Sequence, residues 1–360
     1  MCADRQTVDP TPTELGFSIP AEWERHEATW LGWPHHPTDW PGKLDTIRWV
    51  YGEIVRKIAP GEKVRILVGS AAEERLARRR LASAGAGLGN VRFVRHPTNR
   101  GWTRDSGPVF VKRPGPLSET AIVHLHFNAW AKYRDWAKDR RVPEAAARVL
   151  GKRLFRARVG RRAFVLEGGG IDVNGRGTLL TTEECYLSRR TQARNPGLGR
   201  EGFEAALRAW LGVTNVFWLG RGVKGDDTHG HVDDICRFVN PRTVVLVRET
   251  RRGDRNYRPL AENWERIRDL RLEDGSRPEV VALPMPAPLF HDGLCLPASY
   301  ANFYVANEAV LVPTFNDPND RVALGTLADL FPDRTVVGIH AVDLVLGLGT
   351  LHCLTQQQPA

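Results

Sequence analysis

Short apolar runs alternate with amphipathic stretches along most of this 360-residue chain. The apolar runs are rich in β-branched residues and are bounded by turn residues, which is typical of strands. They cover residues 64–70, 91–96, 215–220, 243–249, 279–284, 309–315 and 335–340. The stretches between them place apolar residues three and four positions apart, which predicts amphipathic helices. These cover residues 45–59, 71–85, 200–212 and 320–331. The alternation predicts an α/β fold.

A hairpin interrupts this alternation at "IDVNGRGTLL" (171–180), where an Asn-Gly turn joins two short alternating segments. The preceding "EGGG" (167–170) lacks the spacing of a dinucleotide-binding loop and leads into this hairpin rather than into a helix. We therefore expect neither a dinucleotide site nor a simple doubly wound sheet.

Length and composition set broad limits. The length alone favours about two domains. The polar, proline-containing residues 1–18 predict a flexible N-terminal tail. No basic segment leads into an apolar one at the start, and no apolar run could span a bilayer, so we expect no membrane partner. The five cysteines are scattered and form no Cys-x-x-Cys pair. They favour free thiols in a reducing cytoplasm.

The net charge of +9 raises the question of a nucleic-acid partner. The densest basic stretches are "RLARRRL" (75–81) and "GKRLFRARVGRR" (151–162). Acidic residues are interleaved along the chain and no nucleic-acid module is visible. We therefore expect an arginine-rich solvated surface and no nucleic-acid partner.

Four clusters differ from the rest of the scaffold: "GWTRDSGPVFV" (101–111), "LEGGG" (166–170), "GDDTHGHVDDICRFV" (225–239) and "GLGTLHCLTQQQPA" (347–360). Taken singly, each has a structural explanation, since Asp105 suits a turn and His231 suits a hydrogen-bonded core. Together they supply a cysteine, a histidine and several carboxylates, which form the inventory of a covalent cysteine hydrolase.

These clusters contain more carboxylates than such a hydrolase needs. With Glu167 assigned to orient His231, both Asp105 and Asp233 remain. A planar guanidinium pairs bidentately with carboxylates. The surplus therefore indicates a cationic, planar substrate group.

A competing hypothesis comes from "HGHVDD" (229–234), which resembles the HxHxDH metal motif of metallo-β-lactamase-fold hydrolases. Two histidines and an aspartate at this spacing could ligate zinc. Asp234 stands where the third histidine of that motif belongs. A zinc-dependent hydrolase is therefore the less favoured alternative.

Six distinctive blocks follow one another along the chain: "AEWERHEATWLGWP" (21–34), "WTRDSGPVFV" (102–111), "LEGGGIDVNGRGTLLTTEECYL" (166–187), "GHVDDICRFV" (230–239), "ASYANFYVANEAVLVPTFNDPND" (298–320) and "HCLTQQQP" (352–359). Together they resemble the agmatine deiminase family, which is related to the bacterial-type peptidylarginine deiminases. The resemblance implies a pseudo-fivefold α/β propeller of repeated strand–helix units around a central active site. It also implies one catalytic domain over residues 19–360, rather than two domains.

The resemblance further implies roles for individual residues. The catalytic group would be Cys353 as nucleophile, His231 as general acid and base, and Glu167 as its partner. The substrate-binding group would be Asp105 and Asp233 at the guanidinium, Trp102 as an aromatic wall, Asp226 and Asp227 near a distal ammonium, and Asn302. No metal or organic cofactor is implied. A homo-oligomer, dimer or larger, stays open.

The implied reaction converts agmatine to N-carbamoylputrescine and ammonia through a covalent cysteine thiouronium. A neighbouring cation would lower the pKa of the thiol. Two departures from the family pattern bear on the substrate. Leu348 and Thr350 stand in a loop that usually reads Gly-Gly-Gly-Asn, and His229 replaces a usual aspartate. Arginine or peptidyl-arginine as substrate, and a catalytically silent binding protein, therefore stay open as alternatives.

Overall fold

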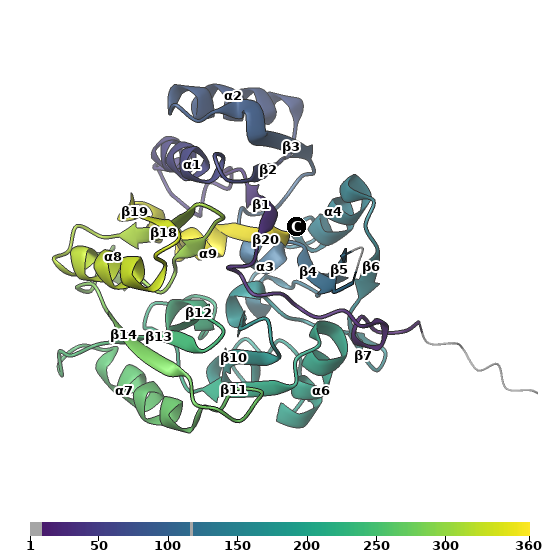
Figure 1. The fold of residues 1–360 in the computed structure, drawn as a ribbon. Helices are drawn as coiled ribbons and strands as arrows, with labels where there is room; N and C mark the ends of the chain where they lie inside the picture. The colour runs from purple at the N-terminus through teal and green to yellow at the C-terminus, as the bar shows by residue number, and fades with distance from the viewer. Residues whose placement is uncertain (1–8, 116–117) are drawn as a thin grey trace, which may run out of the picture.

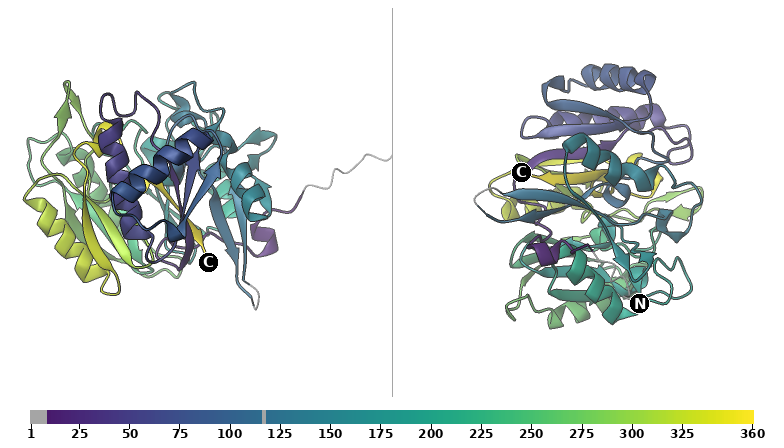
Figure 2. Two further views of the ribbon diagram at one scale, coloured as in Figure 1. Left: turned by 90° about the horizontal axis from the view of Figure 1, so that it is seen from above. Right: turned by 90° about the vertical axis from the view of Figure 1, so that its right-hand side faces the viewer.

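The computed structural model describes residues 9–115 and 118–360. In this part of the chain the strands form five sheets of three or four strands and two small hairpins. Figure 1 shows the five larger sheets arranged around a common centre, with the longer helices towards the outside. Both views of Figure 2 place the last strand, drawn in yellow, in the interior of the molecule.

The five larger sheets have the following strand orders. The first is β20 (Thr355–Pro359), β1 (His26–Gly32), β2 (Lys63–Val68) and β3 (Val91–Arg95). The others are β4 (Val109–Arg113), β5 (Glu119–His124) and β6 (Leu154–Arg156); β11 (Asn215–Leu219), β10 (Thr178–Thr182) and β9 (Asp172–Val173); β12 (Cys236–Asn240), β13 (Thr243–Arg248) and β14 (Glu279–Pro284); and β17 (Tyr304–Val305), β18 (Ala309–Thr314) and β19 (Thr335–His340). The hairpins are β7 (Arg158–Val159) with β8 (Arg162–Ala163), and β15 (Phe290–His291) with β16 (Leu294–Cys295).

Each of the five sheets combines one antiparallel and at least one parallel pairing, as β4–β5 and β5–β6 illustrate. Parallel neighbours need a crossover connection. A helix supplies it in every case: α1 (Leu44–Ile58), α2 (Ala71–Ser83), α4 (Val142–Leu150), α6 (Arg200–Leu211), α7 (Tyr257–Arg266) and α8 (Asn319–Leu330). Three shorter helices are α3 (Thr103–Ser106), α5 (Glu183–Tyr186) and α9 (Leu351–Leu354). The α/β prediction is confirmed.

The sequence pattern located the regular elements well. All seven predicted strands are present, as β2, β3, β11, β13, β14, β18 and β19, and the four predicted helices are α1, α2, α6 and α8. The Asn-Gly hairpin is the antiparallel pair β9–β10. Among the described residues, no helix combines the length and apolar character needed to cross a membrane.

The predicted tail needs a correction. Its residues 1–8 lie outside the described part of the chain. Phe17, in contrast, is only 2% exposed and packs in a core cluster with Val111 and Phe155. The backbone of Ser18 exchanges two hydrogen bonds with Lys112, at 3.0 and 2.8 Å. The prediction of a flexible segment up to residue 18 is therefore wrong at its end, because one buried aromatic ring anchors it to the sheet.

Candidate active site

Each of the four candidate clusters folds into a short helical turn. These turns are α3, η5 (Gly168–Gly170), η6 (Val232–Asp234) and α9. Turn α3 packs against α9 and η5, and η5 packs against η6. Residues that lie 250 positions apart in sequence, such as Thr103 and Leu354, are in hydrogen-bond contact there. The fold therefore brings the four clusters into one site.

Gly169 shows how closely these turns approach one another. A Cβ atom at this position would lie 2.6 Å from Nδ1 of His231 and 3.0 Å from carboxylate oxygens of both Asp105 and Asp233. Such distances are too short for any side chain, so only glycine fits. The glycine run thus lets a histidine and two carboxylates converge on one point.

Asp105 is fixed from two sides. Its Oδ2 accepts a hydrogen bond of 2.8 Å from Nε1 of Trp130, and its Oδ1 accepts one of 3.0 Å from the amide of Gly169. Burial raises the pKa of Asp105; the His231 charge opposes this shift, and the charges of nearby carboxylates add to it. Trp130 was not predicted from the sequence. It lies in a left-handed turn where three successive residues, 129–131, have φ of 51–59°.

His231 lies between carboxylates. Its Nε2 is 3.5 Å from Oε2 of Glu167, and its Nδ1 is 3.9 Å from Oδ1 of Asp105. Arg194 in turn holds Glu167 through contacts of 3.1 and 3.2 Å from its Nε. Burial alone would lower the pKa of His231, but Asp105, Cys185 and Glu167 together raise it well above its ordinary value. These neighbours therefore favour the imidazolium form of the buried His231.

Asp226 and Asp227, which precede His231, make different contacts. Both oxygens of Asp226 accept hydrogen bonds from their own loop, including 2.7 Å from the amide of Gly230 and 3.0 Å from that of His231. Asp226 thus folds the loop that carries His231 and is not part of the cavity lining described below, and its contact with substrate stays a prediction. Asp227 instead pairs with Lys132 and accepts a 2.6 Å hydrogen bond from Tyr133.

Asn302 organises the nucleophile turn. Its Oδ1 accepts hydrogen bonds from the Thr350 hydroxyl at 2.7 Å and from the amide of His352 at 3.1 Å. Its Nδ2 donates to the sulfur of Cys353 at 3.2 Å and to Asp234 at 3.0 Å. This places Asn302 against the nucleophile and not on the wall of the cavity described below. Thr350, which stands where the family usually has asparagine, thus holds Asn302 in place through its hydroxyl group.

The thiol of Cys353 is buried among acids. Its Sγ lies 3.6 Å from Oδ2 of Asp233. Burial raises the pKa of this thiol well above its ordinary value, and the charges of Asp233, Asp234 and Asp105 raise it further. The expectation that a neighbouring cation lowers this pKa is therefore wrong for the unliganded site. Burial and these carboxylate charges both disfavour the thiolate in the unliganded site, and a further cation would favour it.

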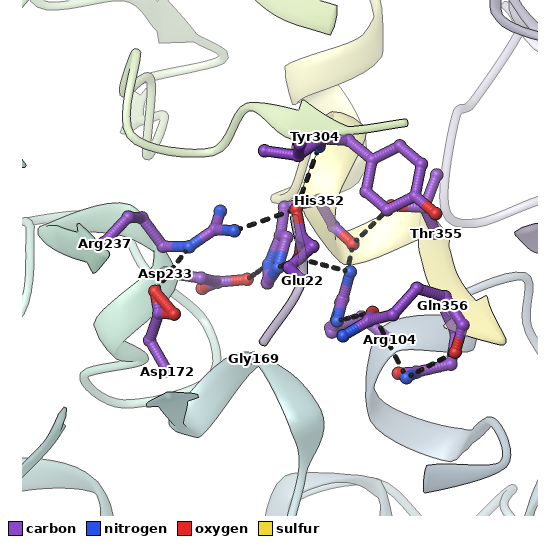
Figure 3. Close-up of polar contacts among 12 residues, drawn as sticks. Glu22, Arg104, Gly169, Asp172, Asp233, Arg237, Tyr304, His352, Thr355 and Gln356 are labelled. Carbon is purple, nitrogen blue, oxygen red and sulfur yellow. Dashed lines mark hydrogen bonds and ion pairs between the residues drawn. The ribbon is translucent and has the colours of Figure 1, made fainter. Parts of the chain in front are cut away.

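A buried ionic network holds Asp233 from behind (Figure 3). Nδ1 of His352 lies 2.7 Å from Oδ2 of Asp233, and its Nε2 lies 2.8 Å from Glu22. Glu22 also contacts Arg104 at 3.1 Å and Arg237 at 3.0 Å. Burial alone would raise the pKa of Asp233, but the hydrogen bond and charge of His352 keep it below its usual value. Apart from the position of His352 next to Cys353, no sequence pattern predicted this network.

A cavity of about 270 Å³ opens onto this site. Its lining includes the buried Cys353, Asp105 and Trp102, which we call the inner end, and the half-buried Arg100 and Asp227, which we call the outer end. The Trp102 ring packs on Trp40 with centroids 5.2 Å apart. Leu348 lines the wall with φ of 66°, in the left-handed region that favours glycine. His229 is not part of this wall.

The zinc motif does not form a metal site. In the part of the chain that the structure describes, the one group of three potential ligands is Glu167, Cys185 and His231. His229 and Asp233 are outside it, so the HGHVDD hypothesis is wrong in its ligand set. Glu167 is already engaged by the Arg194 guanidinium, which disfavours a second cation there.

Comparisons with known proteins cover almost the whole chain. A family model described as Porphyromonas-type peptidyl-arginine deiminase matches residues 18–359. The agmatine deiminase of Pseudomonas putida is 37% identical over 99% of each chain, and that of Ectopseudomonas mendocina is 35% identical over 98% of each chain. The structure of the agmatine deiminase of Enterococcus faecalis aligns with a TM-score of 0.88 at 31% identity, over 98% of each chain. The matched region includes all four turns of the site.

Proposed function

The chain belongs to the Porphyromonas-type peptidyl-arginine deiminase family, and from this premise we propose that it hydrolyses the guanidinium group of agmatine. The products are N-carbamoylputrescine and ammonia. One observation carries the proposal: a buried thiol stands beside the carboxylates of Asp105 and Asp233 at the inner end of a cavity, and one Asp233 oxygen has no hydrogen-bond partner among the described residues.

A guanidinium supplies the missing positive charge. Asp105 lines the cavity next to Cys353, while Oδ1 of Asp233 is buried and has no hydrogen-bond partner among the described residues. A planar cation seated between these two carboxylates would place its central carbon near the sulfur, with Trp102 as an aromatic wall. Paired carboxylates keep the guanidinium charged, which makes that carbon more electrophilic.

The substrate also activates the nucleophile. Burial raises the pKa of Cys353 and the neighbouring carboxylates raise it further, so a bound guanidinium lowers it by offsetting the carboxylate charge, and the thiol proton passes to solvent. The thiolate that forms attacks the guanidinium carbon and makes a C–S bond. His231, already protonated, gives its proton to one nitrogen, and ammonia leaves as the C–N bond breaks.

The remaining thiouronium is a cation on Cys353. Neutral His231 then takes a proton from water, and the resulting hydroxide adds to the same carbon. Collapse breaks the C–S bond and releases the ureido product and the thiolate. The hydroxyl proton of the adduct passes to solvent as the carbonyl forms, and His231 keeps the proton it took from water for the next cycle, with Glu167 and Asp105 on either side to stabilise the imidazolium.

The charged residues at the outer end of the cavity favour particular distal groups on the substrate. Asp227 and Asp39 line it, and the second carboxylate oxygen of Asp39 is buried without a partner among the described residues. These acids suit the distal ammonium of agmatine. Arg100 also lines the cavity and pairs with Asp39. Its charge favours the carboxylate of free arginine, which is the second candidate substrate.

The finer architecture is part of the same proposal. We infer a pseudo-fivefold propeller, since five sheets repeat one antiparallel and one parallel pairing with a crossover helix. A single catalytic domain over residues 19–360 is supported by site residues contributed from four turns far apart in the chain.

The test uses purified protein with agmatine, free arginine and arginyl peptides, each with and without a chelator. Ammonia and ureido product are measured, and Cys353→Ala is the matched control. Turnover of agmatine that survives the chelator and is lost in the variant supports the proposal. Turnover of arginine alone would shift the substrate assignment to the Arg100 alternative. Binding of agmatine without any turnover would contradict the proposed activity.

A further inference from the structure

A second cavity, of about 280 Å³, lies outside the active site and shares no lining residue with it. It is lined by cationic and imidazole side chains: His124, His126, Arg140, Arg141, Arg156 and Arg158. These residues lie on β5, β6 and β7, just after β5, and just before α4, and Figure 1 shows these four elements beside one another at one side of the molecule. Two of the arginines, Arg156 and Arg158, belong to the basic stretch at residues 151–162, which does not contribute to the active site.

The sequence brings these groups together through local structure. The stretch "GKRLFRARVGRR" folds into β6 and the β7–β8 hairpin, so that Arg156 and Arg158 point into one region. Strand β5 pairs in parallel with β6, with His124 opposite Arg156. Arg140 and Arg141 precede α4, and Arg141 is its N-cap without a side-chain cap hydrogen bond. The positive end of the α4 dipole therefore adds to the charge of the arginines.

The positive charge of this cavity has little compensation. The lining contains four arginines and one acid, Glu144, which leaves a net charge of +3 with neutral histidines. Glu144 already contacts Arg156 at 3.2 Å. Elsewhere on the surface, arginines such as Arg56 and Arg78 each have a carboxylate within 2.9 Å. An arginine-rich solvated surface explains those pairs but not a cavity where like charges gather.

The imidazole groups complete the donor set. Nε2 of His124 is buried and has no hydrogen-bond partner among the described residues. Burial lowers the pKa of both His124 and His126; Glu144 and a backbone hydrogen bond to Arg140 oppose the shift at His124, while the charges of His124 and Arg140 add to it at His126. A neutral imidazole next to arginines can still donate one N–H bond. An oxyanion in the cavity would be a partner for both kinds of donor.

We propose that this cavity binds a small molecule carrying at least two phosphate groups. Guanidinium groups bind phosphate oxygens through paired, charge-assisted hydrogen bonds. Two arginine pairs from different elements, Arg140 with Arg141 and Arg156 with Arg158, offer room for two adjacent phosphates. Inorganic pyrophosphate and the phosphate chain of a nucleotide share this chemistry.

Isothermal titration calorimetry of the full chain with pyrophosphate tests the proposal, with orthophosphate and ATP as further arms. The test variant is Arg140→Gln/Arg158→Gln. The matched control is Arg75→Gln/Arg79→Gln, which removes two exposed arginines of the other basic stretch, on α2. All four side chains are exposed, so both variants are expected to fold, and circular dichroism checks this.

We expect pyrophosphate to bind more tightly than orthophosphate. The test variant should weaken binding by about tenfold or more, since two charge-assisted hydrogen-bond donors are lost, and the control should leave it unchanged. ATP binding that equals pyrophosphate binding would identify the phosphates as the recognised group, and tighter ATP binding would add a nucleoside contact. An equal loss in both variants would reduce the effect to general surface charge and overturn the proposal, as would no binding to the wild-type chain.

Discussion

The inner and outer ends of the active-site cavity use charge in different ways. At the inner end, Asp105 and Asp233 are buried around a thiol; His231 lies 3.9 Å from Asp105, and His352 lies 2.7 Å from Asp233. At the outer end, Asp227 has Lys132 and Asp39 has Arg100 as partners. A buried set of acids without enough cations recruits one from the substrate, whereas acids that are already paired recruit one only weakly. The inner end therefore defines the reaction, and the outer end tunes the substrate.

Loss of the nucleophile should have the largest effect. Cys353→Ala leaves both carboxylates in place but removes the group that forms the C–S bond. We expect ammonia release from agmatine to fall by about 10⁵-fold or more. Agmatine should still bind, which calorimetry measures. Residual turnover near the wild-type rate would mean that the thiol is not the nucleophile.

Removal of the proton donor should come next. His231→Gln keeps a similar shape but cannot transfer a proton, and kcat for agmatine should fall by about 10²–10⁴-fold. In the wild-type enzyme, kcat should also fall at high pH. The pKa of His231 is raised, so the acid form persists at neutral pH and is lost only as the pH rises past that value. A rate that grows steadily with pH would contradict this function for His231.

The network behind the inner end should have a smaller effect. His352→Asn breaks the contacts to Asp233 and Glu22, leaving both buried carboxylates with one partner fewer. We expect kcat/KM to fall by about ten- to a hundredfold. His352→Gln retains one amide donor and should recover part of the loss, and rate measurements on both variants decide this. Equal rates in the two variants would indicate that His352 only fills space.

A change at the outer end should have the smallest effect. Asp227→Asn removes one charge that Lys132 already balances in part. The KM for agmatine should rise by about two- to fivefold while kcat stays nearly constant, because exposed ion pairs contribute little. A fall in kcat as large as that of His352→Asn would remove the distinction between the two ends.

The sequence alone predicted the inner end better than the outer one. Cys353, His231 and Glu167 stand in unusual clusters, and the fold brings all three into one site. Trp130 could not be predicted, because no glycine or asparagine in 129–131 marks the left-handed turn that aims it at Asp105.

Asp226 and Asp227 show a second limit of sequence reasoning. The two residues are adjacent and chemically identical, yet one folds the loop and the other lines the cavity. The local backbone conformation decides which way each carboxylate points. A pattern of residue types does not contain that information.

The most direct test of the account compares two alkylating reagents at Cys353, a neutral haloacetamide and a cationic haloacetamidine. Mass spectrometry of the Cys353 peptide measures both rates at neutral pH, with a small free thiol as reference. Carboxylates raise the pKa of Cys353, so the neutral reagent should react slowly, while the cationic reagent should gain rate far beyond its gain on the free thiol. Equal rate ratios on protein and reference would show that the thiolate exists without a bound cation, and would contradict the claim that the substrate completes the charge of the inner end.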